Sequence, residues 1–592
     1  MEQEKYEEIY STIPFTPSKY QDAIFDFVAN GEGNGLINAC AGSAKTTTAI
    51  QSLRFIPPNK KVLFIAFNRD IVKEISAKTE GMKNVTVKTC HSLGYNILNR
   101  NFKTKKVETE NFKYKSYIRN HILDITNIAL SMFSKEEYSQ YLDKIFYLVN
   151  MARLNLVSNL NEMTELAKKY NISLDYDEAE AALSVMDWGM ENLDEVDYTD
   201  MVWLPNVLDL DTKGLQFDWI YVDECQDINN AQRGLFLKCR KEETRILMFG
   251  DRNQAIYAFS GASPEAFDEL GKIPNTREFP LSISYRCASN IVKFAKTLVP
   301  EIESAPNAKK GEVVYNVKIK EIKDGDMVLC RNRQPLITLY MKFLKESVKS
   351  YIRGKDIGKN LINLIQDTNK EELNVSLQND GVFVQLWKKL FEIRDKYMIK
   401  HGLTKEEATF TENVVAMYDS IMALEALSEG LEDSKSLIER LGEVFTDNGT
   451  GIELSTIHKS KGLEANNVYI LCKSLMPSKQ AKMKWEIKQE ENLCYVAYTR
   501  AKLKLGFVSE KEISPSLAMS NADAMYGELS NIEKKIREIL NITTEDVFTK
   551  KKIKKLKPVE EANIGVFKGR EENSLEDLAN ILNKRKKKKR GA

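Results

Sequence analysis

The sequence predicts an α/β protein with two parallel β-sheets. Short apolar runs of strand-forming residues recur in the first and last thirds of the chain, and helical stretches separate them, as in parallel sheets. The 592 residues are also too many for one hydrophobic core, so we expect several domains. The expected strands are residues 62–67, 85–87, 219–222, 246–249, 327–330, 468–471 and 505–508.

Two segments with helical periodicity and few strand signals interrupt the predicted sheets, and we interpret them as helical insertions. The first insertion ends in an acidic stretch at residues 175–200, for which we expect a solvated helix face and no chemistry. The expected boundaries are residues 1–99 and 201–278 for the first lobe, 100–200 for its insertion, 279–345 and 448–512 for the second lobe, 346–447 for its insertion, and 513–592 for a C-terminal helical region with a basic tail.

The composition indicates a soluble intracellular protein. Hydrophobic residues make up 43% and charged residues 29%, and no apolar run reaches the roughly 20 residues that cross a bilayer. Residues 1–10 are acidic and lack the pattern of a secretory signal. The eight cysteines form no C-x-x-C pair, so neither a zinc site nor a disulfide framework is indicated. We expect a cytoplasmic protein with no membrane partner, or a nuclear protein if the source is eukaryotic.

The net charge is only +1, so any surface that binds nucleic acid must be local. The most basic segments are the lysine-rich runs at residues 550–557 and 584–590. Three interpretations of this basic tail are possible. It could add non-specific nucleic-acid affinity through counterion release, act as a nuclear address, or form a disordered solubilising end.

A candidate phosphate-binding loop follows the first strand-like segment. Residues 36–38 lead into ACAGSAKTT at residues 39–47, and a helix-compatible sequence comes next. This order is close to G-x-x-x-x-G-K-[S/T], in which backbone N–H groups at a helix N-terminus surround phosphate oxygens. Lys45 is then expected to neutralise the β- and γ-phosphates of ATP, and Thr46 to hold Mg²⁺. The alternative is a Gly/Ala-rich turn between a strand and a helix.

Alanine replaces both outer glycines of this loop, at Ala39 and Ala44. The Cβ atom of Ala44 is unfavourable if this position requires a backbone angle that only glycine adopts readily. Two alternatives follow from the sequence: the loop is slightly altered, or its backbone angle is compatible with alanine.

Two adjacent acids follow an apolar segment. Asp223 and Glu224 come directly after the predicted strand at residues 219–222, at the edge where α/β sheets bind ligands. Asp223 can reach Mg²⁺, and Glu224 can polarise an attacking water as a general base. A solvated Asp-Glu turn is the alternative, but it fits poorly with acids that directly follow a buried strand.

Further motifs follow one another along the chain. In order, the set is FTPSKYQ ending at Gln21, the loop at 39–47, IAFNRD at 65–70, TCHSLG at 89–94, VDECQD at 222–227, GDRNQAIYAFSGA at 250–262, SYRC at 284–287, STIHKSKGLE at 455–464 and EENLCYVAYTRA at 490–501. In sequence and in order these motifs resemble those of the UvrD/Rep/PcrA-like branch of superfamily 1 helicases. Ser260 stands where the family has arginine. The segments AFNRDIVKE and YIRGKDIGK look closest to compact viral or F-box-type relatives, which fits a bacteriophage origin.

The resemblance implies two RecA-like lobes of the P-loop NTPase class, with helical insertions that the family calls 1B and 2B and with ATP and Mg²⁺ as cofactors. The implied catalytic residues are Lys45, Asp223, Glu224, Gln254, Arg286 and Arg500. The implied ATP contacts are Gln21, Ala41, Gly42, Ser43, Ala44, Lys45, Thr46, Thr47, Tyr285, Arg286, Glu464 and Arg500, and the implied Mg²⁺ ligands are Thr46 and Asp223. The two arginines would reach ATP from the second lobe; the alternative for each is a surface ion pair.

The resemblance also implies a surface for single-stranded DNA, which binds by base stacking on aromatic rings and by polar contacts to its backbone. The implied DNA contacts are Phe67, Asn68, Thr89, His91, Tyr257, Phe259, Thr456 and His458. The alternatives are core positions for the aromatic residues and buried, hydrogen-bonded positions for the histidines.

The sequence therefore predicts an ATP-dependent DNA helicase. By resemblance it translocates 3′ to 5′ on single-stranded DNA and unwinds duplexes in replication, recombination or repair. Expected partners are single-stranded and tailed duplex DNA, together with replication or recombination proteins. The leading alternative is a non-unwinding single-stranded DNA translocase or a recombination-regulating DNA-binding ATPase, because translocation and unwinding share one motor. A small-molecule kinase would need the phosphate loop but not the motifs at 250–262, 455–464 and 490–501.

Overall fold

The structure of the protein is a computed structural model. It describes residues 1–102, 106–107, 112–126, 135–258, 261–409, 411–447, 449–479, 481–509, 512 and 522–542. Contacts divide the chain into a unit from Met1 to Phe548 and a unit from Thr549 to Ala592, and every described residue belongs to the first unit. Within the described part of the chain, no helix combines the length and apolar character needed to cross a membrane.

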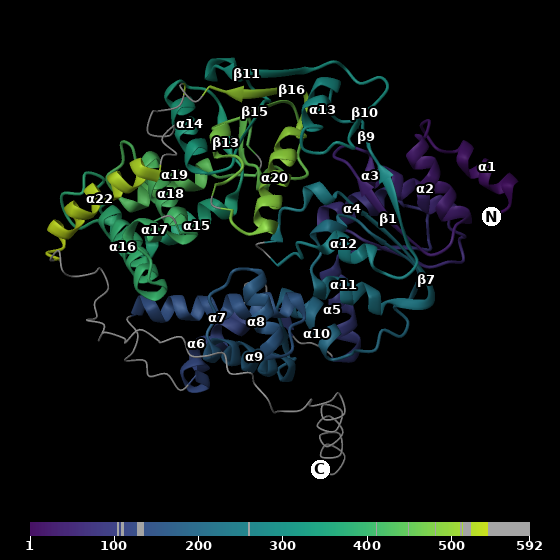
Figure 1. Cartoon of the computed structure of the whole chain (residues 1–592), viewed down its shortest axis with the longest axis horizontal. Coiled ribbons are helices and arrows are strands. Elements are labelled where there is room, and N and C mark those ends of the chain that lie inside the picture. Colours follow the sequence, from purple (N-terminus) through teal and green to yellow (C-terminus); the bar gives the residue numbers. More distant parts are fainter. Residues whose placement is uncertain are drawn as a thin grey trace, which may run out of the picture. The chain divides into compact units, whose positions relative to one another are not determined.

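The first of two six-stranded sheets lies in the N-terminal part of the chain (Figure 1). Its strands are β1 (Asn34–Ala39), β2 (Val62–Ile65), β3 (Val85–Lys88), β6 (Phe217–Val222), β7 (Arg240–Gly250) and β8 (Thr276–Leu281). Their order is β3-β2-β6-β7-β1-β8, and every neighbouring pair is parallel. The apolar run of β6 is buried almost throughout, as expected for a strand that is covered on both faces. The sheet continues past residue 278, to the end of β8.

The second sheet is also six-stranded and parallel. Its strands are β11 (Glu312–Val317), β12 (Met327–Cys330), β13 (Ser350–Ile352), β14 (Ile452–Thr456), β15 (Ala465–Ile470) and β16 (Ala501–Val508). Their order is β11-β16-β15-β12-β14-β13. Short parallel pairs lie outside both sheets: β4 (Lys106–Val107) with β5 (Glu195–Val196), and β9 (Ile283–Ser284) with β10 (Glu303–Ser304). The predicted α/β class with two parallel sheets is confirmed.

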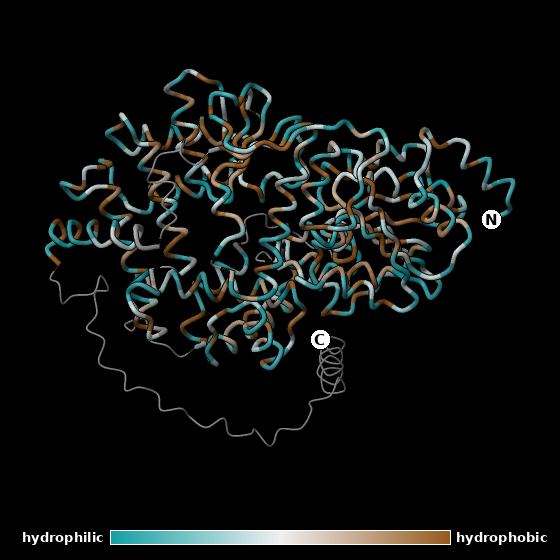
Figure 2. The backbone as a smooth tube through the Cα atoms, turned by 45° about the horizontal axis from the view of Figure 1, so that its top comes forward, coloured by the Kyte–Doolittle hydropathy of each residue, from teal (hydrophilic) through white to brown (hydrophobic). Residues whose placement is uncertain are grey.

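Helices cover both faces of each sheet, because crossovers between parallel strands need connections of this kind. They are α1 (Gln3–Ser11), α2 (Lys19–Asn30), α3 (Lys45–Ser52), α4 (Arg69–Lys78), α5 (Cys90–Asn101), α10 (Tyr198–Val207), α11 (Asn230–Lys238), α12 (Ala266–Gly271), α13 (Ser289–Ala295), α14 (Gln334–Lys345) and α20 (Lys484–Tyr498). On the first sheet, α2, α3 and α4 cover one face, and α5, α10, α11 and α12 cover the other. On the second sheet, α13 and α20 cover one face and α14 the other. Figure 2 shows the hydrophobic segments concentrated in the interior.

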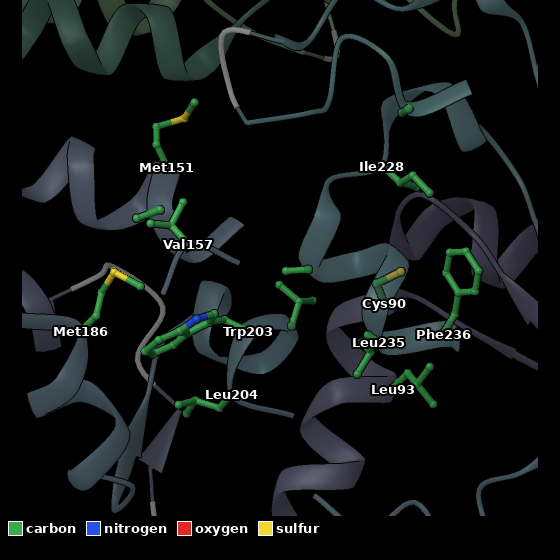
Figure 3. Close-up of a cluster of buried hydrophobic side chains, with 14 of the residues drawn as sticks. Cys90, Leu93, Met151, Val157, Met186, Trp203, Leu204, Ile228, Leu235 and Phe236 are labelled. Carbon is green, nitrogen blue, oxygen red and sulfur yellow. The ribbon is translucent and has the colours of Figure 1, made fainter. Parts of the chain in front are cut away.

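Insertion 1, at residues 100–200, shares its hydrophobic core with the first sheet. Its helices are α6 (Phe112–Thr126), α7 (Lys135–Asn155), α8 (Leu160–Lys169) and α9 (Tyr176–Glu191). Met151 of α7 and Met186 of α9 belong to the same buried cluster as Trp203 of α10 and Leu235 of α11 (Figure 3). Insertion 1 is therefore packed onto the first sheet through α10 and α11.

The prediction of a solvated helix face at residues 175–200 is wrong for Glu178, which is buried and paired with Lys144 of α7. It is also wrong for the last two acids, Asp197 and Asp200, which are fully buried. Arg153 of α7 makes ion pairs of 2.9 Å with each of them, and Lys113 of α6 lies 2.7 Å from Asp200. Both acids also form the capping box at the start of α10. Charge runs are usually solvated, but these carboxylates are buried because buried cations and a helix N-terminus require them as partners.

Insertion 2, expected at residues 346–447, begins only after β13, because Ser350–Ile352 is a strand of the second sheet. The insertion packs on this sheet and on a helix from the C-terminal region. Its helices are α15 (Lys355–Gln366), α16 (Val382–His401), α17 (Lys405–Thr409), α18 (Glu412–Leu427) and α19 (Ser434–Val444). The C-terminal helix α22 (Ala522–Ile539) adds Leu529 and Ile536 to their core. Arg394 of α16 donates a hydrogen bond of 2.7 Å to Glu533 of α22, and both side chains are buried. The basic runs at 550–557 and 584–590 lie outside the described residues.

Replacing Glu533 is expected to destabilise the docking of α22. Glu533→Ala leaves Arg394 as a buried charge with one partner fewer, so we expect the free energy of unfolding to fall by about 3 kcal/mol. Denaturant titration at pH 7 measures the change, with Glu538→Ala as the control, because Glu538 is an exposed acid of the same helix. Equal unfolding midpoints for Glu533→Ala and the control would contradict the prediction.

The pKa of Glu533 predicts that its contribution to the free energy of unfolding depends on pH. Burial raises the pKa of Glu533, but Arg394 and Lys405 outweigh burial and lower this pKa to about 2. Because this value lies below the roughly 4.3 of an unfolded glutamate, the stabilisation is present above about pH 5 and is lost as the pH falls toward 2. The difference in unfolding midpoint between the wild type and Glu533→Ala should therefore shrink at pH 3.

Candidate functional site

The candidate site lies at one edge of the first sheet, where the carboxyl ends of three strands meet. The phosphate loop follows β1, Asp223 and Glu224 follow β6, and Asp251 follows β7, which lies between the other two strands. Lys45, at the start of α3, lies 2.6 Å from Glu224 Oε1 and 3.5 Å from Asp223 Oδ1. Thr46 Oγ1 lies 3.5 Å from Asp223 Oδ2. The sheet order thus brings together motifs that are far apart in the sequence.

The backbone conformation of Ala44 shows how the phosphate loop accommodates alanine at a position where glycine is expected. Ala44 lies in the left-handed region, with φ of 59° and ψ of 36°, directly before α3. This conformation costs a non-glycine residue roughly 1–2 kcal/mol. Because Ala44 adopts it nevertheless, the loop has the backbone shape that glycine favours. Ala39 ends strand β1 as an ordinary extended residue. Gly42 also has a positive φ, and a Cβ atom there would lie 2.5 Å from the Cβ of Arg286 in the second lobe.

The charges at this edge are strongly coupled. Burial alone would lower the pKa of Lys45, but Glu224 and Asp223 raise it well above its ordinary value. Burial raises the pKa of Glu224, but the charges of Lys45 and Lys461 outweigh it and hold this pKa at about 2. Burial raises the pKa of Asp223, against the opposing charge of Lys45. At neutral pH, Lys45 and Glu224 therefore form a charged pair.

The residues present fit a nucleotide with Mg²⁺. Ser43 Oγ is buried and has no hydrogen-bond partner, so the phosphate loop keeps an unused polar group at a helix N-terminus. The hydroxyl of Thr46 and the carboxylate of Asp223 are hard oxygen ligands, and Mg²⁺ is usually held by one or two protein groups plus phosphates and waters. In the described part of the chain, no cluster of three or more His, Cys, Asp or Glu side chains could hold another metal.

Residues of the second lobe reach the same edge. Arg500, which follows α20, donates to Gln254 Oε1 at 3.3 Å. Burial and the charge of Arg286 lower the pKa of Arg500 to about 10, so it stays charged at neutral pH. Gln254 in turn donates to Asp251 at 2.7 Å. Lys461 forms an ion pair with Asp227 of the first lobe.

Arg286 and Tyr285 lie beside the phosphate loop. The backbone N–H of Tyr285 donates to the carbonyl of Gly42 at 2.8 Å, and its side chain is 47% exposed. Arg286 is paired with Glu464 at 2.6 Å, and Glu464 also forms an ion pair with Lys502. Burial raises the pKa of Glu464, but Lys502 and Arg286 outweigh burial and lower it. Both arginines predicted to contact ATP thus lie near the loop, although each is engaged within the protein.

Gln21 holds helix α2 against α3. Its side-chain oxygen accepts from the Ser18 backbone N–H at 3.0 Å, which completes the capping box of α2. Its amide nitrogen donates to Thr48 Oγ1 at 3.0 Å. Both ends of the Gln21 carboxamide are therefore used inside the first lobe, next to the phosphate loop.

The predicted DNA contacts include an aromatic pair in which Phe67 is exposed and Tyr257 is partly buried. Phe67, 49% exposed, lies parallel to Tyr257, with ring centroids 6.3 Å apart and planes 15° apart. The ammonium of Lys461 lies over the Tyr257 ring at 4.9 Å, and the Tyr257 hydroxyl donates to the His458 carbonyl at 3.2 Å. Phe259 lies outside the described residues.

The other predicted DNA contacts are partly engaged in local structure. Asn68 and Thr89 accept hydrogen bonds as the N-caps of α4 and α5, and Thr456 is buried at the end of β14. Burial lowers the pKa of His91. Burial, followed by the charge of Arg331, lowers the pKa of His458 to about 4. Both histidines are therefore uncharged at neutral pH when no DNA is bound.

Sequence reasoning missed several residues that complete this edge. Asp227, Asp251 and Lys461 lie inside quoted motifs, but no role was assigned to them. Burial raises the pKa of Asp227 to about 6 against the opposing charge of Lys461, and burial likewise raises the pKa of Asp251 to about 6. Tyr495 of α20 accepts from the Ala41 backbone N–H at 2.9 Å. Acids that follow strands could have been found from the sequence; the contact of Tyr495 could not.

Two family models match this chain. The model described as the UvrD/REP helicase N-terminal domain matches residues 21–274, and the model described as the UvrD-like helicase C-terminal domain matches residues 332–512. The chain belongs to the UvrD/Rep helicase family. The matched residues include the phosphate loop, Arg500 and the strands of both sheets other than β8, β11 and β12.

Curated relatives of this chain carry the names of DNA helicases. The chain is similar to F-box DNA helicase protein 1 of Schizosaccharomyces pombe, at 24% identity over 79% of this chain and 55% of the relative. It is similar to the probable DNA helicase II homologue of Mycoplasma pneumoniae, at 24% identity over 49% and 44%. It is also similar to ATP-dependent DNA helicase Rep of Buchnera aphidicola, at 21% identity over 80% and 92%. The chain spans about half the length of the first two relatives.

Ala44→Gly is expected to keep or raise the stability of the first lobe. The change removes the roughly 1–2 kcal/mol of left-handed strain but adds about 0.5–1 kcal/mol of backbone entropy to the unfolded chain, so the net gain is at most about 1 kcal/mol. Ala44→Val should lower stability, because a β-branched residue is strongly disfavoured at a φ of 59°. Denaturant midpoints decide this, and a lower midpoint for Ala44→Gly would contradict the reading of the loop.

Proposed function

We propose that the chain is an ATP-dependent DNA helicase. It translocates 3′ to 5′ on single-stranded DNA and couples ATP hydrolysis to duplex unwinding in replication, recombination or repair. The observation that supports this best is the link between the two lobes, in which Arg500 contacts Gln254 and Lys461 contacts Asp227, beside the Lys45–Glu224 pair. The names of the relatives, which include DNA helicases Rep and helicase II, point to the same function.

In this proposal Lys45, Thr46 and Asp223 hold the nucleotide and its metal. Bound Mg²⁺ and ATP supply the phosphoryl chemistry, in which charge spreads over the transferred group. Lys45 turns from Glu224 toward the phosphates, so the first of the two cations that lower the pKa of Glu224 moves away while Lys461 stays in place. The freed Glu224 then has higher basicity and accepts a proton from the attacking water.

Arg500 and Arg286 supply positive charge from the second lobe. Arg500 is already buried against Gln254, whereas Arg286 must exchange its contact with Glu464 for a phosphate. Because both arginines belong to the second lobe, their contacts with phosphate depend on how closely the lobes approach, and hydrolysis is then coupled to lobe movement.

The Phe67–Tyr257 pair is the proposed stacking surface for single-stranded DNA. Aromatic stacking contributes about 1–3 kcal/mol per base and tolerates any sequence, as a translocating protein requires. Tyr257 is joined to the second lobe by its hydrogen bond to the His458 carbonyl, and Lys461 lies over its ring. A change in the ATP site can therefore reach the stacked base through Lys461, which also contacts the Gln254 carbonyl at 2.6 Å.

Lys45→Ala is expected to reduce DNA-stimulated ATP hydrolysis by about a hundredfold or more, because a buried charge on the phosphates is lost. A phosphate-release assay with single-stranded DNA measures the effect. Lys83→Ala is the control, since Lys83 is exposed and lies outside the site. Full activity in Lys45→Ala would remove the proposed phosphate site.

Duplexes with a single 3′ or 5′ tail test unwinding and its direction. We expect ATP-dependent strand separation that requires the 3′ tail, and a preference for the 5′ tail would overturn the direction. Displacement of streptavidin from biotin-labelled single strands measures translocation separately. Streptavidin displacement without strand separation would instead support the non-unwinding translocase.

A further inference from the structure

Helix α20 of the second lobe lies along the first-lobe segment that contains Gln254. Gln489 accepts a hydrogen bond from the Ala258 backbone N–H at 3.0 Å, and Asn492 donates to the Ala255 carbonyl at 3.0 Å. These two residues lie three positions apart and share one face of the helix. One face of α20 is therefore fixed to the segment after β7 by directional contacts.

The C-terminal end of α20 reaches the ATP site. Tyr495 is bound to the phosphate loop at the Ala41 N–H, and Arg500, just beyond the helix, is bound to Gln254. Tyr495, Asn492 and Gln489 continue the same helix face. A movement of the phosphate loop or of Gln254 therefore acts directly on the C-terminal end of α20, and the helix transmits it to its other end.

The N-terminal end of α20 contacts insertion 1. Trp485 Nε1 donates to the Lys169 carbonyl at the end of α8 at 2.9 Å, and its ring meets the edge of Tyr170 with centroids 5.9 Å apart. Tyr170 is buried, and its hydroxyl donates to the Ala262 carbonyl at 3.3 Å. Lys169 also pairs with Glu265 at 2.6 Å. The end of α8 is therefore held both by α20 and by the segment after residue 260.

We propose that Trp485 and Tyr170 are positioning residues that link the ATP site to insertion 1 through α20. Trp485 is four positions before Gln489 on the same helix face, so it moves with the contacts to the phosphate loop and Gln254. Neither residue contacts the atoms of the Lys45, Asp223 and Glu224 group. Their role is to transmit movement to insertion 1, not to hydrolyse ATP. This inference rests on the proposed motor function.

The test compares Trp485→Ala and Tyr170→Phe with Ile487→Ala, an exposed apolar residue of the same helix. DNA-stimulated kcat and KM for ATP are measured together with strand separation on the tailed duplex. We expect Trp485→Ala to keep both ATPase constants within about twofold while unwinding falls about tenfold, since a coupling energy of 1–3 kcal/mol is typical. Tyr170→Phe, which removes only the hydroxyl, should lower unwinding less, and Ile487→Ala should change neither activity.

The ratio of base pairs opened to ATP consumed decides the inference, because a general loss of folding lowers both activities together. If this ratio is unchanged in both Trp485→Ala and Tyr170→Phe, including the case in which ATPase and unwinding fall equally, the proposed link is overturned. If wild-type protein hydrolyses ATP and translocates but does not unwind, the rate of streptavidin displacement replaces strand separation. Absence of all movement in the wild type would contradict the proposed function itself.

Discussion

The partly buried charge of Lys45 is the constraint on which the rest of the site depends. A buried ammonium group is stable only beside carboxylates, and Asp223 and Glu224 supply them from the end of β6. β1 and β6 are not neighbours, because β7 lies between them, so the parallel order of the sheet alone brings the loop and the acids to one edge. The same order places Asp251 between them, where it fixes Gln254, the group that Arg500 contacts.

The contacts between the lobes are of a kind that can be exchanged. Arg500, Tyr495 and the Tyr285 backbone each reach the first lobe through one polar contact, and Lys461 reaches it through two. A neutral hydrogen bond contributes only about 0.5–1.5 kcal/mol net and one to a charged group about 1.5–3 kcal/mol, so such contacts can break and re-form one at a time. Each insertion shares a continuous hydrophobic core with its own sheet, whereas, of the described residues of the first lobe, only Cys40, Ala41 and Ile256 join the buried core of the second lobe. Movement is therefore expected between the lobes, with each insertion following its sheet.

Much of the fold was predictable because parallel strands leave a strong signal. Runs such as residues 219–222 and 327–330 are apolar throughout, and each is a buried central strand in the structure. Runs of charged residues predict structure less well. The pattern at residues 175–200 predicts a solvated face for Asp197 and Asp200, but both are buried against Arg153. A sequence pattern does not distinguish an acid that faces water from an acid that faces a cation brought by another helix.

The sequence by itself determined the order of the motifs, the identity of the charged groups and the two-sheet class, because these depend on local residue types and periodicity. Only the tertiary structure decided that Ala44 takes the left-handed conformation, that Lys461 meets Asp227, and that Trp485 meets insertion 1. These last two contacts join residues more than 200 positions apart, and sheet order and helix packing set such distances. No local pattern encodes them, because their free energy arises only after both lobes have folded.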